Sequence, residues 1–129
     1  MAREILKLKN AYSTQGRGYS HAAKAGNTLY IAGQIPKNAD NEFIGLGNFE
    51  AQARQVYANI KNIVTEAGGS LENVVMMTTI LVNPDDIDTC LKVRSEFFQD
   101  PYPPNTMFIA KRLPHPDVLI EVDAVAVLD

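Results

Sequence analysis

The segment Val74–Val82 constrains the fold more than any other part of the chain. It reads Val-Val-Met-Met-Thr-Thr-Ile-Leu-Val, and such a run, rich in β-branched residues, favours a single strand. Alternate residues of a strand face opposite sides, so the two faces carry Val74, Met76, Thr78, Ile80 and Val82, and Val75, Met77, Thr79 and Leu81. Both sets are apolar, which is typical of a strand that is covered on two sides.

Two helices are predicted, one before and one after this strand. The first has apolar residues at spacings of three and four, namely Phe49, Ala53, Val56, Ile60, Ile63, Val64 and Ala67. Asn48 is suited to cap its start, and Gly68-Gly69 to end it. The second helix follows Asn83-Pro84 and carries on one side Ile87, Cys90, Leu91, Arg94, Phe97 and Phe98.

The remaining strands are predicted near the two ends of the chain. Ser20–Ala25 and Thr28–Ala32 flank Gly26-Asn27, a pair that favours a tight hairpin turn. Thr106–Ala110 and Val118–Val127 are the last two strands. The order of hairpin, helix, strand, helix, strand and strand predicts an α+β fold, in which two helices cover one face of a mixed sheet.

Two helices of about four turns each can cover only one face of a sheet of about five or six strands. The opposite face, apolar at Val74–Val82, needs another cover. Another copy of the same chain is the simplest source of that cover. We therefore expect a homo-oligomer.

Composition excludes several classes of function. A chain of 129 residues, 46% of them apolar, fits a single domain over residues 1–129. The net charge is −3 and the Lys and Arg residues are scattered, which does not favour nucleic-acid binding. The single cysteine, Cys90, suits a reducing compartment. With neither a signal-peptide pattern nor an apolar run long enough for a bilayer, we expect a cytoplasmic protein without a membrane partner.

The chain contains four short motifs, and their order and spacing indicate a protein family more specifically than any single motif does. They are Tyr19-Ser20, Ala32-Gly33-Gln34-Ile35-Pro36, Pro103-Pro104-Asn105-Thr106 and Ile120-Glu121-Val122. Together, over residues 17–127, they resemble the RidA/YjgF family of small trimeric imine and enamine deaminases. The resemblance implies a chorismate-mutase-like fold, a homotrimer whose sheets face a central barrel, and small-molecule clefts between subunits. We expect neither a cofactor nor a metal, since the histidines and the cysteine have no ligand spacing.

Glu121 is the strongest candidate for a catalytic residue. It stands between Ile120 and Val122 in an apolar strand, where burial would raise its pKa and suit it to handling a proton or water. The alternating pattern alone favours a carboxylate that faces solvent. The resemblance instead implies a site residue, because the family's glutamate orients the water that attacks the C=N carbon.

The resemblance also implies that several residues bind substrate around Glu121. Tyr19 matches a tyrosine that enters a neighbouring subunit's cleft, although packing within the hairpin would also explain it. Gly33 matches a position where the backbone closely approaches the ligand, although a plain strand end is the alternative. The family often has a serine just before this glycine, and here the residue is Ala32.

Asn105 is the main departure from the family pattern. The family's deaminases carry an arginine here that grips the substrate carboxylate, whereas asparagine offers one neutral amide. Met107 would make the pocket more apolar, or it simply packs within its strand. Arg17 could supply the missing charge at the mouth of the cleft, or it is an exposed loop residue.

Three functional hypotheses follow from these residues. The first is hydrolysis of a small, neutral or weakly anionic metabolite at a reactive C=N or related C–N bond, with Glu121 orienting the water. The second is a trimer that binds a small ligand without converting it. The third is a ribonuclease or translation inhibitor, which the acidic balance disfavours because phosphate neutralisation dominates nucleic-acid affinity.

Overall fold

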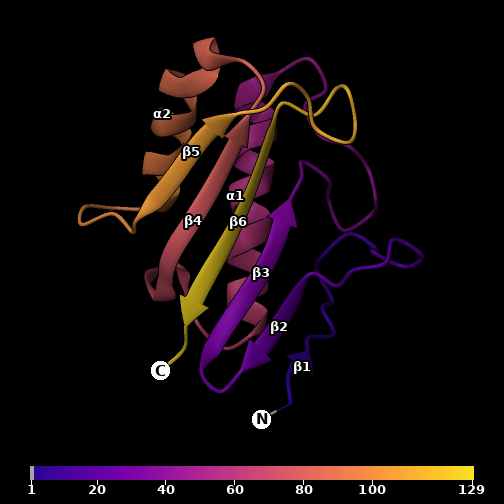
Figure 1. Ribbon diagram of the computed structural model, residues 1–129, viewed down its shortest axis with the longest axis vertical. Coiled ribbons are helices and arrows are strands. Elements are labelled where there is room, and N and C mark those ends of the chain that lie inside the picture. The colour runs from indigo at the N-terminus through magenta and orange to yellow at the C-terminus, as the bar shows by residue number, and fades with distance from the viewer. Residues whose placement is uncertain (1) are drawn as a thin grey trace.

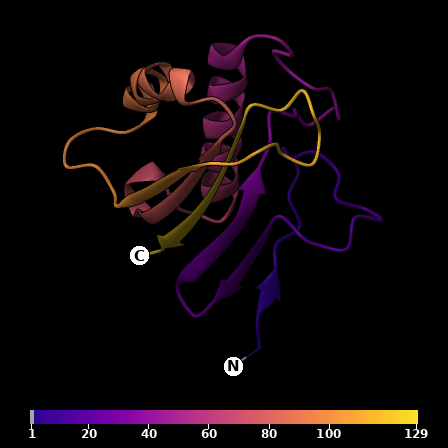
Figure 2. The same ribbon diagram turned by 45° about the horizontal axis from the view of Figure 1, so that its top comes forward.

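Six strands form one mixed sheet, and two helices cover one of its faces (Figures 1 and 2). The computed structural model describes residues 2–129. The strands are β1 (Glu4–Ile5), β2 (Ala22–Ala25), β3 (Thr28–Gln34), β4 (Val74–Leu81), β5 (Asn105–Ile109) and β6 (Ile120–Val127). Their order across the sheet is β1-β2-β3-β6-β4-β5, with β4 and β5 parallel and the other described neighbours antiparallel.

The helices are α1 (Phe49–Glu66) and α2 (Ile87–Phe97). Asn48 caps α1 as predicted, because its side chain accepts a hydrogen bond of 3.1 Å from the N–H of Ala51. Gly68 follows the helix with a φ of +95°, a left-handed conformation that glycine adopts readily. Short 3-10 turns at Leu71–Asn73 and Pro84–Asp86 lead into β4 and α2.

The hydrophobic core lies between the sheet and the two helices. Its fully buried side chains include Tyr57 and Ile60 of α1, Val93 of α2, Leu81 of β4 and Val122 of β6. Burial of one such aliphatic side chain contributes about 1.5–3 kcal/mol, so this layer fixes the position of the sheet on the helices.

A β-bulge changes the predicted faces of β4. Val74 pairs with Ala126 and Met76 pairs with Val125, so Val75 is an extra residue between them. The prediction that Val74 shares a face with Met76 was wrong, because the bulge reverses the alternation at this point. The buried, helix-facing residues of β4 are Val74, Met77, Thr79 and Leu81.

The other elements were predicted with small differences at their ends. The hairpin strands begin at Ala22 and end at Gln34, and the last strand begins at Ile120. The short strand β1 was missed, because two exposed residues carry no alternating pattern. None of the described helices is long and apolar enough to cross a bilayer.

The sheet face turned toward the viewer in Figure 1, here called the open face, carries no described helix. Large apolar side chains in neighbouring register lie on it, namely Tyr30, Met76, Ile80, Phe108 and Val125. Tyr30 is 53% exposed and Phe108 48% exposed, which leaves an apolar surface on the isolated chain. Such a surface suits contact with a further copy of the chain.

Candidate functional site

A cleft of about 580 Å³ opens where β3 ends and β6 begins. Its walls come from these strand ends and from loops before β2, after β3 and before β6. Five of the predicted site residues line it, namely Arg17, Tyr19, Ala32, Gly33 and Glu121. We refer to it as the Glu121 cleft.

The Glu121 side chain lies directly against the backbone of Gly33. A Cβ atom at position 33 would come 2.5 Å from Oε2 of Glu121 and 2.7 Å from its Cδ. Real Cβ atoms do not approach other atoms so closely, so glycine lets the carboxylate lie here and any larger residue would push the Glu121 side chain aside. The register of β3 on β6 also shifts between Ile31 and Gln34, beside this contact.

The surroundings of Glu121 favour its protonated form. Burial raises the pKa of the Glu121 carboxyl above its usual range, and the nearby negative charge of Asp123 raises it further. Within residues 2–129, no hydrogen-bond donor or cation lowers this pKa. The carboxylate is therefore unusually basic and its oxygens are available to a water molecule.

Tyr12 is a cleft residue that the sequence did not indicate. Its side chain is 3% exposed, and its hydroxyl accepts a hydrogen bond of 3.4 Å from the N–H of Ile35. Burial raises the pKa of Tyr12 strongly, and the neighbouring Tyr19 and Glu121 add to the shift. Tyr12 thus places a neutral phenol near Tyr19 and Glu121.

His21 and Gln34 tie the loop that contains Tyr12 to the sheet. Nε2 of His21 lies 2.6 Å from the carbonyl oxygen of Tyr12. A carbonyl oxygen can only accept a hydrogen bond, so Nε2 is the donor. Nδ1 then accepts from Nε2 of Gln34 at 3.1 Å, and the same nitrogen donates to the carbonyl of Ala32 at 3.1 Å. These bonds fix the wall of the cleft next to Gly33.

Two polar residues of α1 hold the other loops of the cleft. The Asn59 amide donates to the carbonyls of Ile35 and Lys37, both at 3.0 Å. The Gln52 amide donates to the Asp117 carbonyl at 3.0 Å and accepts from the N–H of Leu119 at 2.8 Å. Both side chains are buried, so α1 positions the segments on either side of Gly33 and Glu121.

The Glu121 cleft also contains two cations. Arg17 is an exposed loop residue, and it also lines the Glu121 cleft. The two positions that the sequence offered for Arg17 are therefore compatible. Lys37 was not predicted; its Nζ lies 5.8 Å from the ring centre of Tyr12 and 5.2 Å from that of Phe43. In the described part of the chain, no carboxylate lies within 4.0 Å of Lys37.

Asn105 and Met107 lie away from the Glu121 cleft. Asn105 pairs with Met77 on the helix-covered side of the sheet, whereas Glu121 pairs with Ile80 on the open face. Met107 packs partly against the core on the same side as Asn105. One chain therefore does not bring these two residues to Glu121.

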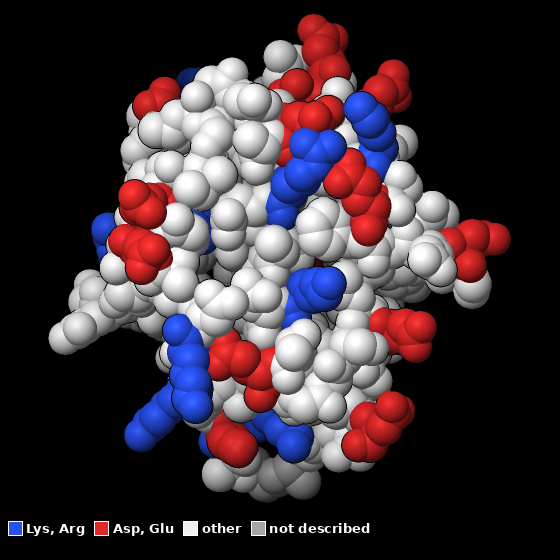
Figure 3. Space-filling model, turned by 180° about the vertical axis from the view of Figure 1, so that it is seen from behind, with Lys and Arg blue, Asp and Glu red and all other residues white. Residues whose placement is uncertain are grey.

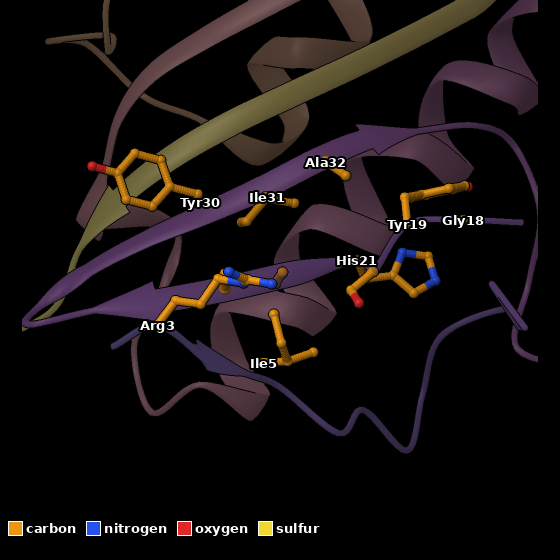
Figure 4. A pocket seen from close by; sticks show the side chains of 11 residues that line it. Arg3, Ile5, Gly18, Tyr19, His21, Tyr30, Ile31 and Ala32 are labelled. Carbon is orange, nitrogen blue, oxygen red and sulfur yellow. The ribbon is translucent and has the colours of Figure 1, made fainter. Parts of the chain in front are cut away.

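A second pocket, of about 460 Å³, adjoins the cleft on the open face (Figure 4). Arg3, Ile5 and Tyr30 surround it, and Tyr19 and Ala32 line both pockets. No acidic residue lines this second pocket. His21 lines it, but both ring nitrogens of His21 already form hydrogen bonds, to the Tyr12 carbonyl and to Gln34.

Replacing Gly33 with alanine tests the contact with Glu121. The added methyl group would push aside the Glu121 carboxylate, which ends a flexible, half-buried side chain, so we expect a cost near the lower end of the about 1–3 kcal/mol that overpacking takes from the unfolding free energy. In a Glu121→Ala background the same change should cost far less. Chemical denaturation of the four proteins measures the coupling. An equal cost in both backgrounds would show that Glu121 does not lie against Gly33.

Comparison with known proteins agrees with the fold and the motifs. The family model described as Endoribonuclease L-PSP matches residues 9–128. The chain belongs to the RidA/YjgF family. A RutC family protein of Pyrococcus abyssi is 39% identical over 126 residues, or 98% of each chain.

Two RidA/YjgF relatives carry the names of deaminases. A 2-iminobutanoate/2-iminopropanoate deaminase of Dermatophagoides farinae is 30% identical over 111 residues, or 86% of each chain. The 3-aminoacrylate deaminase RutC of Acinetobacter baylyi is 34% identical over 108 residues, which cover 84% of this chain and 85% of that one.

Solved structures of the RidA/YjgF family have the same fold. RidA from Psychrobacter sp. matches with a TM-score of 0.89 at 32% identity, covering 97% of this chain and 99% of that one. E. coli TdcF, solved with bound serine, matches with a TM-score of 0.89 at 30% identity, covering 98% and 99%. These matches confirm the predicted α+β fold.

Proposed function

We propose that this protein hydrolyses a small reactive imine or enamine at sites shared between the subunits of a homotrimer. The observation that carries the proposal is the Glu121 carboxylate, which is half-buried, has a raised pKa and accepts no hydrogen bond from the described residues 2–129. A basic carboxylate in a cleft is suited to accept a proton from water. The deaminase names of two relatives support the same chemistry.

In the proposed reaction, Glu121 orients a water molecule toward the C=N carbon. The water oxygen bonds to this carbon while one of its protons passes to Glu121, and the nitrogen takes up a proton to give a carbinolamine. The proton that the nitrogen takes up is the one that Glu121 accepted from water. Glu121 next accepts the hydroxyl proton of the carbinolamine and delivers it to the nitrogen, so that the C–N bond breaks, ammonia leaves, a carbonyl product forms and the carboxylate is restored. The neutral phenol of Tyr12 and the side chain of Tyr19 line the cleft, where each can donate a hydrogen bond to the substrate.

Contact between copies would bring the remaining predicted residues to the cleft. Asn105 and Met107 lie on the edge strand β5, which β4 separates from the Glu121 strand β6, and on the opposite side of the sheet from Glu121. The apolar open face needs a cover that the described chain does not supply. We propose that a neighbouring subunit of a trimer covers it and presents Asn105 opposite Glu121. Trimeric assembly is what the family resemblance implies.

Asn105 shapes the proposed substrate range. A neutral amide binds a carboxylate less strongly than a guanidinium fork, so we propose that neutral or weakly anionic imines are the preferred substrates. Arg17 and Lys37 supply positive charge at the Glu121 cleft itself, and Ala32 donates no side-chain hydrogen bond there.

RNA is not favoured as a substrate. On the helix-covered side, basic and acidic side chains are interspersed and no continuous basic patch forms (Figure 3). Nucleic-acid binding depends on the neutralisation of several successive phosphates, and the net charge of the chain is −3.

Two measurements test the proposed function together. Analytical ultracentrifugation should give about three times the 14.2 kDa mass of the chain, because the open face is apolar. The protein should also accelerate ammonia release from small imines generated in situ, relative to their spontaneous hydrolysis. A stable monomer would contradict the shared site. A trimer that binds carbonyl products but never accelerates ammonia release would instead be a ligand-binding protein.

A further inference from the structure

A buried cation without a carboxylate partner lies close to Asn105. Arg94 of α2 is 9% exposed, and its Nε donates to the hydroxyl of Tyr57 at 3.0 Å. Its Nη2 donates to Oγ1 of Thr79 at 3.1 Å. Among residues 2–129, no carboxylate lies within 4.0 Å of this guanidinium. A buried charge is costly unless another charge or strong hydrogen bonds compensate it.

The other neighbours of Arg94 do not supply a negative charge. Cys90 lies 4.0 Å from Nη2, but burial raises the pKa of its thiol and keeps it protonated. Burial likewise raises the pKa of Tyr57, so its hydroxyl stays neutral. The positive charge of Arg94 is therefore not balanced within its surroundings.

The directions of the hydrogen bonds connect Arg94 to Asn105. Arginine can only donate, so Oγ1 of Thr79 accepts from it. The hydroxyl hydrogen of Thr79 is then donated to Oδ1 of Asn105, at 2.7 Å. This bond fixes the Asn105 amide with its oxygen toward Thr79. The two hydrogens on Nδ2 have no partner in the described chain, so Asn105 presents donors only.

We propose that Arg94 acts through Thr79 and Asn105 to bind a negatively charged or polarised oxygen of the substrate, which is a carboxylate oxygen where the substrate has one. The proposal rests on the proposed function, because that function places Asn105 in a cleft shared between subunits. A charge at one end of a hydrogen-bond chain polarises each bond along it, which strengthens the donors of Nδ2. Arg94 is a positioning residue, since Asn105 alone would touch the ligand.

In this arrangement the positive charge comes from Arg94 on α2. The resemblance implies that the family's deaminases instead carry an arginine at the position of Asn105, on β5. The guanidinium stays under the sheet, bonded to Tyr57 and Thr79, and only a neutral amide meets the ligand. Such a subsite binds a carboxylate more weakly than a direct guanidinium fork would. It also leaves room at Asn105 for a larger substituent than an arginine at this position would allow.

Two ligands and two substitutions test this inference. The ligands are 2-oxobutanoate and its neutral amide 2-oxobutanamide, titrated into the assembled protein by calorimetry. Thr79→Val keeps the size of the side chain but removes the bridging hydroxyl, and Arg94→Gln removes the charge. Each should weaken 2-oxobutanoate binding roughly tenfold and leave the amide unchanged, because interactions with charged groups are the stronger ones.

Matched variants separate this role from general stability. Lys92→Gln removes a charge from the exposed side of the same helix and should change neither affinity. Thr79→Ser keeps the hydroxyl and should retain 2-oxobutanoate binding even if Thr79→Val is less stable. If Thr79→Val and Arg94→Gln fold and bind 2-oxobutanoate as the native protein does, the inference is wrong and the proposed function stands. If the native protein binds neither ligand, both are wrong.

Discussion

Replacing Glu121 with glutamine is expected to lower kcat for imine hydrolysis by roughly 10²–10⁴-fold, the usual contribution of a general base. Glutamine has nearly the same size, so it keeps the contact with Gly33 and most of the affinity for substrate. It cannot accept a proton from water. The loss should therefore fall on kcat rather than KM, as measured by ammonia release under steady-state conditions.

A stability measurement serves as the control for this variant. Because burial raises the pKa of Glu121, the folded protein holds this proton to a higher pH than the unfolded chain does. The contribution of the Glu121 proton to the free energy of unfolding is therefore largest below the unfolded-state pKa of about 4.3. This contribution is lost as the pH rises through the folded-state pKa. Glu121→Gln should therefore gain stability relative to the native protein as pH increases. Full native turnover by a folded Glu121→Gln variant would exclude Glu121 as the base.

Asn105→Arg is expected to raise turnover of 2-iminobutanoate by about one order of magnitude. The native protein should hydrolyse this substrate poorly, because a neutral amide lacks the bidentate fork that matches a carboxylate. The new side chain would stand close to Arg94, and the Thr79 hydroxyl would lose its acceptor. Like charges and the unpaired hydroxyl should limit the gain.

The double variant Asn105→Arg with Arg94→Gln should gain more than Asn105→Arg alone. Glutamine at position 94 removes the repulsion and offers an oxygen to the Thr79 hydroxyl. The rates of the native protein, both single variants and the double variant form a cycle that measures the coupling. Additive effects would show that positions 94 and 105 act independently. Strong native turnover of 2-iminobutanoate that survives Arg94→Gln would point to Arg17 or Lys37 as the source of charge.

Much of the fold could be predicted because local patterns and tertiary packing agree. The spacing of apolar residues in α1, its Asn48 cap and the turn at Gly26-Asn27 each specify one local structure. The faces of β4 could not be derived in full. The extra residue Val75 depends on the pairing with β6, which alternation along one strand does not reveal.

Short motifs indicated several of the residues that line the Glu121 cleft. Gly33 and Glu121 were chosen separately, and the structure places them in direct contact. Tyr12 and Lys37 were missed because each stands alone in a loop without periodicity, and they reach the cleft only through the fold. The side of the sheet that Asn105 faces was also not predicted, since it depends on the parallel register of β5 on β4.

A crystal structure of the assembled protein with 2-oxobutanoate tests the central claim most directly. We expect a trimer with the ligand in the Glu121 cleft. The keto group should lie within hydrogen-bonding reach of a water held by Glu121, and the carboxylate should meet Nδ2 of Asn105 from a neighbouring subunit. Ligand bound in the pocket of Figure 4, or bound beside Glu121 with every Asn105 remote from it, would show that the two residues do not share a substrate site.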